Sequence, residues 1–204
     1  MGRIVIGVTG NIASGKSETA RMLQDKGCAL VDADAVAHSL YARDPALLQQ
    51  MAGEFGPDIL WGNGTLNRNR LASLVFGKPE ALIALNRIVH PVLVAIIRER
   101  MHTALRVMNR VVLDAALIVE LGFAGEVDYL VLVSASVEVR RERLMQRSGL
   151  SLDEAQRRID SQIPEEAKLQ HADFVIKNET TREYLQEQVD ALWEEIEMRE
   201  RAEE

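Results

Sequence analysis

The chain of 204 residues has very few cysteine and aromatic residues. Cys28 is the only cysteine, so neither a disulfide bond nor a site of several thiolates can form within one chain. Aromatic residues make up 4% of the sequence while 47% is hydrophobic, which predicts a mainly aliphatic core large enough for one domain. Because apolar residues 29–31 follow Cys28 directly, we expect it to be a buried packing residue.

The sequence also lacks an excess of basic residues and a long apolar run near its start. Lys and Arg number 24 against 31 Asp and Glu, which gives a formal net charge of −7. A general nucleic-acid-binding protein needs a basic surface, so this balance argues against that class. The apolar run 4–8 is too short to span a membrane. We therefore expect a cytoplasmic protein with neither a nucleic acid nor a membrane as partner, and the sequence carries no indication of its oligomeric state.

Five short apolar segments, rich in β-branched residues, predict five buried strands. They are 4–8, 29–31, 111–114, 129–133 and 174–176. Segments with helical spacing separate them along the chain. Strands that are apolar throughout and alternate with helices predict an α/β fold, with a five-stranded parallel sheet covered by helices on both faces.

The loop after the first predicted strand fits the pattern G-x-x-x-x-G-K-[ST]. Its residues are Gly10, Asn11, Ile12, Ala13, Ser14, Gly15, Lys16 and Ser17. In this pattern, backbone N–H groups and a helix N-terminus bind the phosphates of a nucleotide. The lysine reaches the β- and γ-phosphates, and the serine hydroxyl is placed to bind Mg²⁺. The alternative is a glycine-rich turn that arose by chance, but the preceding strand and following helix favour a phosphate-binding loop (P-loop).

Three aspartates lie at the end of a predicted strand or just after one, and they are expected at the same edge of the sheet. Asp114 ends an apolar strand, and the carboxylate that holds Mg²⁺ in P-loop enzymes has the same position. The alternative is an aspartate that only caps the turn after the strand. Asp32 and Asp34 follow the second strand. A carboxylate there can take a proton from an acceptor hydroxyl or help to hold Mg²⁺, whereas helix capping is the competing interpretation for Asp34.

The remaining parts of the chain predict one P-loop kinase domain with two additions. Its core comprises 1–44, 109–147 and 168–204, the helical patterns of 45–108 form an insertion, and polar 148–167 forms a lid that closes over ATP.

Arg140, Arg143 and Arg147 share one helical face. We expect most of this face to be solvated, with Arg147, which precedes the lid, as the exception. His90 is a lone histidine, and such a residue is more often structural than catalytic.

Several further motifs make the chain resemble the dephospho-coenzyme A kinase family from Ile4 to about Trp193. They are Asp32-Ala33-Asp34, the stretch Leu66–Phe76 with Arg68, His90-Pro91, Gln146-Arg147 followed by Arg158-Ile159 and Gln162, and Ala172-Asp173 followed by Asn178. The sequence departs from the family pattern at a few positions. Asn11 and Ala13 replace glycines, Glu18 replaces a common threonine, and Ala116 replaces a proline.

The resemblance implies transfer of the γ-phosphate of ATP to the ribose 3′-hydroxyl of dephospho-coenzyme A. It implies Asp34 as the base, Lys16 and Arg147 as the cations that stabilise the transferred group, and the segment from Gly10 to Glu18 as the ATP site. Mg²⁺ would bind Ser17 and Asp114, and the acceptor would contact Thr9, Asp34, Arg68 and His90. Two alternatives remain: another small-molecule P-loop kinase, such as a nucleoside-monophosphate kinase, and a nucleotide-binding module without catalysis.

Overall fold

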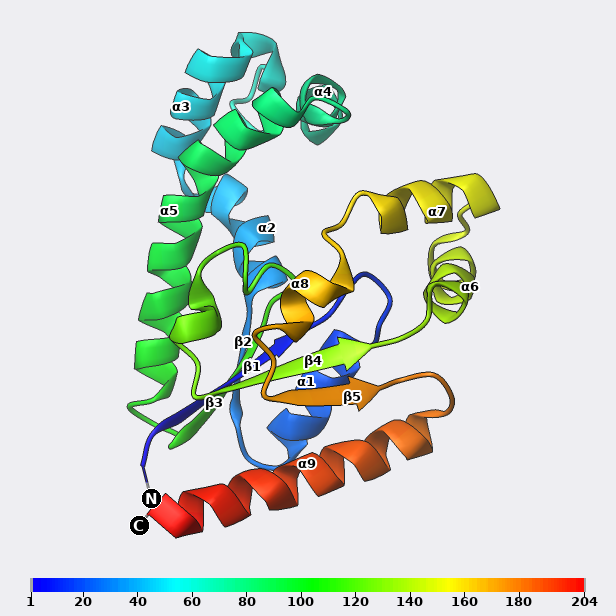
Figure 1. The fold of residues 1–204 in the computed structure, drawn as a ribbon. Helices are drawn as coiled ribbons and strands as arrows, with labels where there is room; N and C mark the ends of the chain where they lie inside the picture. Colours follow the sequence, from blue (N-terminus) through cyan, green and yellow to red (C-terminus); the bar gives the residue numbers. More distant parts are fainter. Residues whose placement is uncertain (1, 204) are drawn as a thin grey trace. The chain divides into compact units, whose positions relative to one another are not determined.

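Five apolar, β-branched segments form the strands of one sheet in the computed structural model, which describes residues 2–203. All neighbouring strands are parallel, and their order is β2-β3-β1-β4-β5 (Figure 1). The strands are β1 Ile4–Thr9, β2 Ala29–Asp32, β3 Arg110–Asp114, β4 Tyr129–Ser134 and β5 Phe174–Lys177. The predicted five-stranded parallel α/β fold is confirmed.

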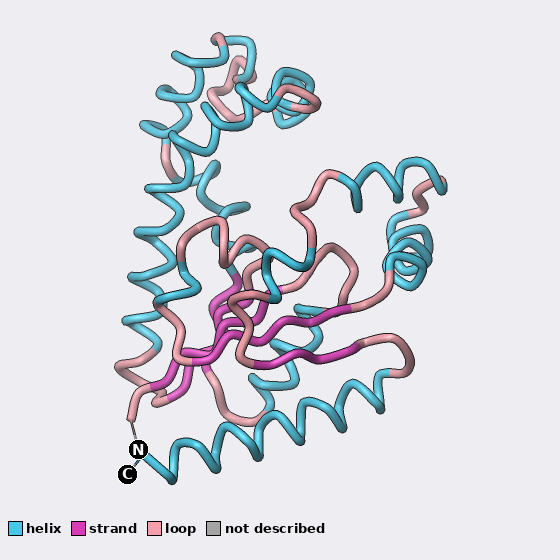
Figure 2. Tube along the Cα trace, in the orientation of Figure 1, coloured by secondary structure: helices cyan, strands magenta, loops and turns pink. Residues whose placement is uncertain are grey.

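Helices connect the strands, as the tube in Figure 2 shows. They are α1 Lys16–Asp25, α2 Ala33–Arg43, α3 Pro45–Phe55, α4 Arg68–Val75, α5 Pro79–Ala104, α6 Val137–Ser148, α7 Leu152–Asp160, α8 Glu165–Leu169 and α9 Arg182–Glu203, with short 3₁₀ turns η1 Pro57–Ile59 and η2 Phe123–Gly125. Local sequence determines several of their ends. Ser151 and Glu154 form a reciprocal capping box at the start of α7, and Gly149 ends α6 in the left-handed conformation.

The chain divides into two compact units. Residues 2–32 and 101–203 form the unit that contains the sheet, and residues 33–100 form a helical unit. The helical unit contains α2, α3, η1, α4 and most of α5, together with an isolated antiparallel bridge between Leu60 and Leu66. The segment 148–167, predicted as a lid, contains α7 and the start of α8 and belongs to the unit with the sheet.

The side chains of the strands alternate between two buried layers, because successive residues of a strand point to opposite faces of the sheet. On one face, Ile6, Val131 and Ile176 pack in one cluster with residues of α1 and α9, among them Leu23 and Val189.

The alternate residues of the same strands point to the opposite face of the sheet and form the second layer. Leu113 of β3 and Leu130 of β4 are at most 1% exposed, and Ile118, in the loop after β3, is fully buried. A Cβ atom at Gly7 of β1 would lie 2.9 Å from Ile118 Cδ1 and 3.1 Å from Leu130 Cδ1, so these side chains meet over the central strand. The alternation therefore fills a core on each face of the sheet.

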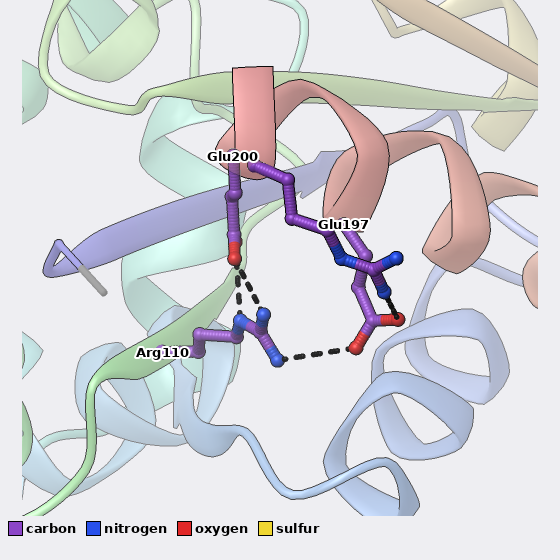
Figure 3. Close-up of polar contacts among 4 residues, drawn as sticks. Arg110, Glu197 and Glu200 are labelled. Atoms are coloured by element: carbon purple, nitrogen blue, oxygen red, sulfur yellow. Dashed lines mark hydrogen bonds and ion pairs between the residues drawn. The ribbon is translucent and has the colours of Figure 1, made fainter. Parts of the chain in front are cut away.

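A group of charged and aromatic side chains attaches the end of α9 to the start of β3. Arg110 Nε donates to Glu200 Oε1 at 3.1 Å, and Arg110 Nη1 lies 3.7 Å from Glu197 Oε1 (Figure 3). The Arg110 guanidinium also lies 4.7 Å from the ring centre of Trp193. The hydrogen bond with Glu200 raises the pKa of Arg110, so the guanidinium stays charged in this partly buried position.

The helix α5 is long and apolar enough, by length and composition alone, to cross a membrane. It has 26 residues, and its mean hydropathy reaches 1.7 over an 18-residue stretch. This was not expected from the sequence. Arg87 and His90 lie near the middle of the helix. A charged side chain at the centre of a bilayer costs roughly 3 kcal/mol or more, so Arg87 argues against lipid around α5.

The prediction that Cys28 is buried is confirmed, since it is 3% exposed. Burial raises the pKa of the thiol from 9.0 to about 11, although the nearby charge of Arg110 acts in the opposite direction and that of Glu200 adds to the increase. Between these two pH values the folded chain keeps the proton while the unfolded chain releases it. The stability that comes from this difference is fully present below pH 9 and is lost as the pH rises toward 11.

We therefore expect the wild-type protein to lose more stability at alkaline pH than a Cys28→Ala variant does. Between about pH 8 and about pH 10.5 the extra loss should be roughly 2 kcal/mol in the free energy of unfolding. Urea unfolding of both proteins at the two pH values measures it, and the cavity left by the substitution cancels in the comparison. Equal losses in the two proteins would contradict the raised thiol pKa.

Candidate active site

The loop between β1 and α1 has the backbone conformation of an anion-binding turn. Ala13 and Gly15 both have positive φ, 62° and 100°. Ser14 N donates to Asn11 O at 3.0 Å, and the N–H groups of Glu18 and Thr19 bond to Gly15 O as α1 begins. Successive peptide units of this kind direct N–H groups into one concave site. The loop therefore has the form that the motif predicts.

The two motif glycines are required because other atoms approach the loop closely. A Cβ atom at Gly10 would lie 2.4 Å from Val133 O, and one at Gly15 would lie 2.0 Å from Asn178 Nδ2. No side chain fits at either distance. Ala13, by contrast, is a non-glycine residue in the left-handed region, a conformation that costs about 1–2 kcal/mol.

A buried ion pair lies at the end of the loop. Lys16 Nζ is 2.6 Å from Asp114 Oδ1, and the two side chains are 10% and 3% exposed. Asp114 ends β3, where it is in register with Asp32 of β2 and Val8 of β1. The structure thus places Asp32 and Asp114 side by side at the edge of the sheet and pairs Asp114 with Lys16. Ser17 follows Lys16 in the first turn of α1.

The arginines of α6 differ from the sequence prediction. The expected solvated face is wrong for Arg140, which is 6% exposed and whose Nε and Nη1 atoms have no hydrogen-bond partner. It is also wrong for Arg143, whose Nη1 lies 3.4 Å from Ala13 O and 3.5 Å from Ser14 O. Arg147 lies exposed in the last turn of α6. Periodicity showed that these side chains share a face, but it could not show what packs against that face.

The end of the predicted lid segment contacts the P-loop. Ile12 N donates to Gln162 Oε1 at 2.7 Å, and Asn11 Nδ2 donates to Ile163 O at 3.4 Å. A pocket of about 400 Å³ lies here. Its lining includes Asn11, Arg140 and Gln162, and also residues 134–137 and 163–166.

Lys168 and Thr9 share one backbone acceptor behind the loop. Lys168 Nζ donates to Ala116 O at 2.8 Å, and Thr9 Oγ1 donates to the same oxygen at 3.2 Å. Lys168 is 1% exposed, and its burial lowers its pKa despite the opposing effect of Glu120. Thr9 is fully buried. In this conformation the side chain of Thr9, predicted to contact the acceptor, holds the backbone instead.

The other predicted acceptor residues belong to the helical unit. Asp34 lies exposed in the first turn of α2. Arg68, at the start of α4, donates from Nη2 to His38 O at 3.3 Å, and its guanidinium lies 5.4 Å from the ring centre of Tyr41. Arg68 is therefore held against the helix that carries Asp34. His90 is half-buried in α5, next to the internal Pro91.

Several residues that contact the loop had no role assigned from the sequence. Asn178, which follows β5, donates from Nδ2 to Ser14 O at 2.8 Å. Gln162, Lys168 and Arg143 also contact the loop or the segment behind it. Asn178 and Gln162 lie within motifs that the family resemblance contains, which is the one signal that pointed to them. Asn178 and Gln162 are far from the P-loop in the sequence, so the sequence alone does not indicate that they contact it.

Comparisons with known proteins agree with this geometry. The family model described as "Dephospho-CoA kinase" matches residues 4–183. A dephospho-CoA kinase of Syntrophotalea carbinolica is 40% identical over 190 residues, covering 93% of this chain and 90% of the relative. The solved structure of TT1252 from Thermus thermophilus is 36% identical, covers 96% of this chain and 98% of that chain, and has a TM-score of 0.78. Dephospho-CoA kinase from Campylobacter jejuni is 29% identical, covers 95% and 97%, and has a TM-score of 0.62.

The strained residue of the loop gives a testable prediction. We expect Ala13→Gly to stabilise the protein by about 0.5–1 kcal/mol, because glycine adopts the positive φ freely and only part of this gain is offset by the entropy of the unfolded chain. Urea unfolding measures the change. Gly15→Ala serves as the opposite control and should destabilise the protein, since its Cβ would collide with Asn178. A loss of stability in Ala13→Gly would contradict the prediction.

Proposed function

The chain belongs to the dephospho-CoA kinase family, and we propose that it transfers the γ-phosphate of ATP to the ribose 3′-hydroxyl of dephospho-CoA, the last step of coenzyme A synthesis. The observation that carries the proposal is the P-loop between β1 and α1, with Lys16 buried against Asp114 at its end. Family membership favours this acceptor over nucleoside monophosphates. It also disfavours a nucleotide-binding module without catalysis.

We assign the binding of the ATP phosphates to the loop and the first turn of α1, residues 10–18. Backbone N–H groups of the loop and the N-terminus of α1 favour anions. Lys16 adds a positive charge at the position where the β- and γ-phosphates lie in this type of loop. Phosphoryl transfer depends chiefly on position and charge, so these groups account for much of the catalysis.

Mg²⁺ fits the oxygen ligands at this place. Within residues 2–203 there is no group of three or more acidic, histidine or cysteine side chains suited to a metal ion. Mg²⁺ does not require one, since it usually keeps several waters and binds one or two protein oxygens with the substrate phosphates. Ser17 would supply a hydroxyl, and Asp114 would supply a carboxylate by exchanging its contact with Lys16 for one with the ion. When bound there, the ion would neutralise charge on the phosphates.

The acceptor reaction is assigned to Asp34. Its carboxylate would take the proton of the 3′-hydroxyl while the oxygen forms a bond to the γ-phosphorus and the bond from that phosphorus to the leaving ADP breaks. Its exposed position in the first turn of α2 lets a ligand reach the carboxylate. Arg147 would cover the transferred group as the lid 148–167 closes. Arg68 and His90 would hold the acceptor within the helical insertion, 45–108 in the sequence prediction.

We place the enzyme in the cytoplasm, where ATP and Mg²⁺ are available. Arg87, near the middle of α5, disfavours lipid around that helix. Dephospho-CoA is the only partner proposed.

The direct test is ADP formation with ATP, Mg²⁺ and a panel of acceptors. We expect turnover with dephospho-CoA and none above background with nucleoside monophosphates, because the chain belongs to the dephospho-CoA kinase family. A coupled assay that follows ADP measures it, and mass spectrometry confirms the product. Turnover only with nucleoside monophosphates, or none with any acceptor, would contradict the proposal.

A second prediction concerns the base. Asp34→Asn should lower kcat by at least about 100-fold, because the amide accepts no proton, while the affinity for ATP changes little. Steady-state kinetics and calorimetric ATP titration measure the two effects. Glu183→Gln is the matched control, as it removes an exposed carboxylate from the first turn of α9 and should leave both unchanged. Near wild-type kcat in Asp34→Asn would rule out this role.

A further inference from the structure

We propose that Asn178 and Arg143 are positioning residues that hold the strained P-loop backbone in its phosphate-binding conformation. Both residues act on the nucleotide site of the proposed kinase. This inference depends on the proposed function in one respect, which is that ATP is the ligand of the loop. Asn178 follows β5 and Arg143 lies on α6, so two elements distant in sequence from the loop meet at residues 13–15.

The contacts converge on two carbonyl groups of the loop. Asn178 Nδ2 donates to Ser14 O at 2.8 Å, and Arg143 Nη1 lies 3.4 Å from Ala13 O and 3.5 Å from Ser14 O. The two positioning residues also bond to each other, since Arg143 Nη2 donates to Asn178 Oδ1 at 3.3 Å. That bond orients the amide so that its N–H groups, and not its oxygen, face the loop.

The direction of these carbonyls determines the direction of the neighbouring N–H groups. The C=O and N–H of one trans peptide unit point in opposite directions. When Asn178 binds Ser14 O, the N–H of Gly15 in the same peptide unit points away from Asn178, toward the inner side of the loop. Such inward N–H groups are the ones that bind an anion. Asn178 and Arg143 thus bind the outer, carbonyl side of the loop and orient the N–H groups on its inner side without touching the phosphates.

Asn178 is itself rigidly placed. It is 7% exposed, and its backbone N–H donates to Ser134 O at 2.8 Å. The loop approaches so closely that a Cβ at Gly15 would lie 2.0 Å from Asn178 Nδ2. A buried amide in this position is fixed before any ligand binds, which is what a positioning residue requires.

The loop needs such support because Ala13 has a φ of 62°. An alanine favours negative φ, so without external contacts the loop would relax toward another conformation. A glycine at this position would have no such preference. The contacts from Asn178 and Arg143 and the strain at Ala13 are therefore expected to be energetically coupled.

The experiment compares ATP with tripolyphosphate, a probe that has the phosphate chain and no base. Asn178→Asp keeps the shape and can still accept from Arg143, but it has no N–H for Ser14 O. We expect calorimetric affinities for both probes to fall by about five- to tenfold, the effect of one lost hydrogen bond to a positioned backbone group. Gln188→Ala is the matched control, because Gln188 bonds to the backbone of the adjacent Lys177 and should leave both affinities unchanged.

The double variant Ala13→Gly with Asn178→Asp tests the coupling. In the Asn178→Asp background, Ala13→Gly should recover about half or more of the affinity that Asn178→Asp alone loses. Loss of ATP affinity with unchanged tripolyphosphate affinity would show a base contact and overturn the proposal. Lower thermal stability with both affinities unchanged would also overturn it. If these affinity changes occur but the wild type does not phosphorylate dephospho-CoA, the positioning role stands and the proposed function fails.

Discussion

The peptide conformation of residues 13–15 is the constraint on which the nucleotide site depends. Ala13 and Gly15 both have positive φ. This conformation is unfavourable for an alanine, so the surrounding structure must maintain it at Ala13. Neighbouring elements each contribute a contact: α6 through Arg143, the turn after β5 through Asn178, and the segment before α8 through Gln162. The order of the strands places β1 between β3 and β4, so the loop starts at the centre of the sheet, where these elements meet.

Much of this architecture could be predicted from local sequence. The strands are short, apolar and β-branched, and a chain of alternating strands and helices buries such strands only in a parallel sheet. The P-loop was equally predictable, because the functions of Gly10, Gly15 and Lys16 are properties of the loop itself. The rule that strand ends of a parallel sheet meet at one edge predicted that Asp114 lies near the loop, but it did not predict the ion pair with Lys16.

The contacts that support the loop could not be predicted in the same way. A helical repeat shows that Arg140 and Arg143 share a face, but their burial depends on which segment covers that face. Asn178 is 164 residues from Ser14 in the sequence, and nothing in its local sequence indicates that its amide bonds to Ser14 O. The left-handed conformation of Ala13 is likewise determined by tertiary contacts, since alanine has no local preference for it.

Several buried cations lie at the loop or behind it, although the chain as a whole is acidic. The formal net charge is −7, yet Lys16, Arg140 and Lys168 are all at least nine-tenths buried close to the loop or behind it. Burial lowers the pKa of Lys168, and the charges of Lys16 and Arg140 lower it further, whereas Glu120 acts in the opposite direction. Asp114 pairs with Lys16 and Glu120 lies 4.0 Å from Lys168, so carboxylates offset part of the repulsion among the three cations. A polyphosphate bound at the loop would relieve that repulsion, so the same side chains that cost stability in the free protein would favour the anion.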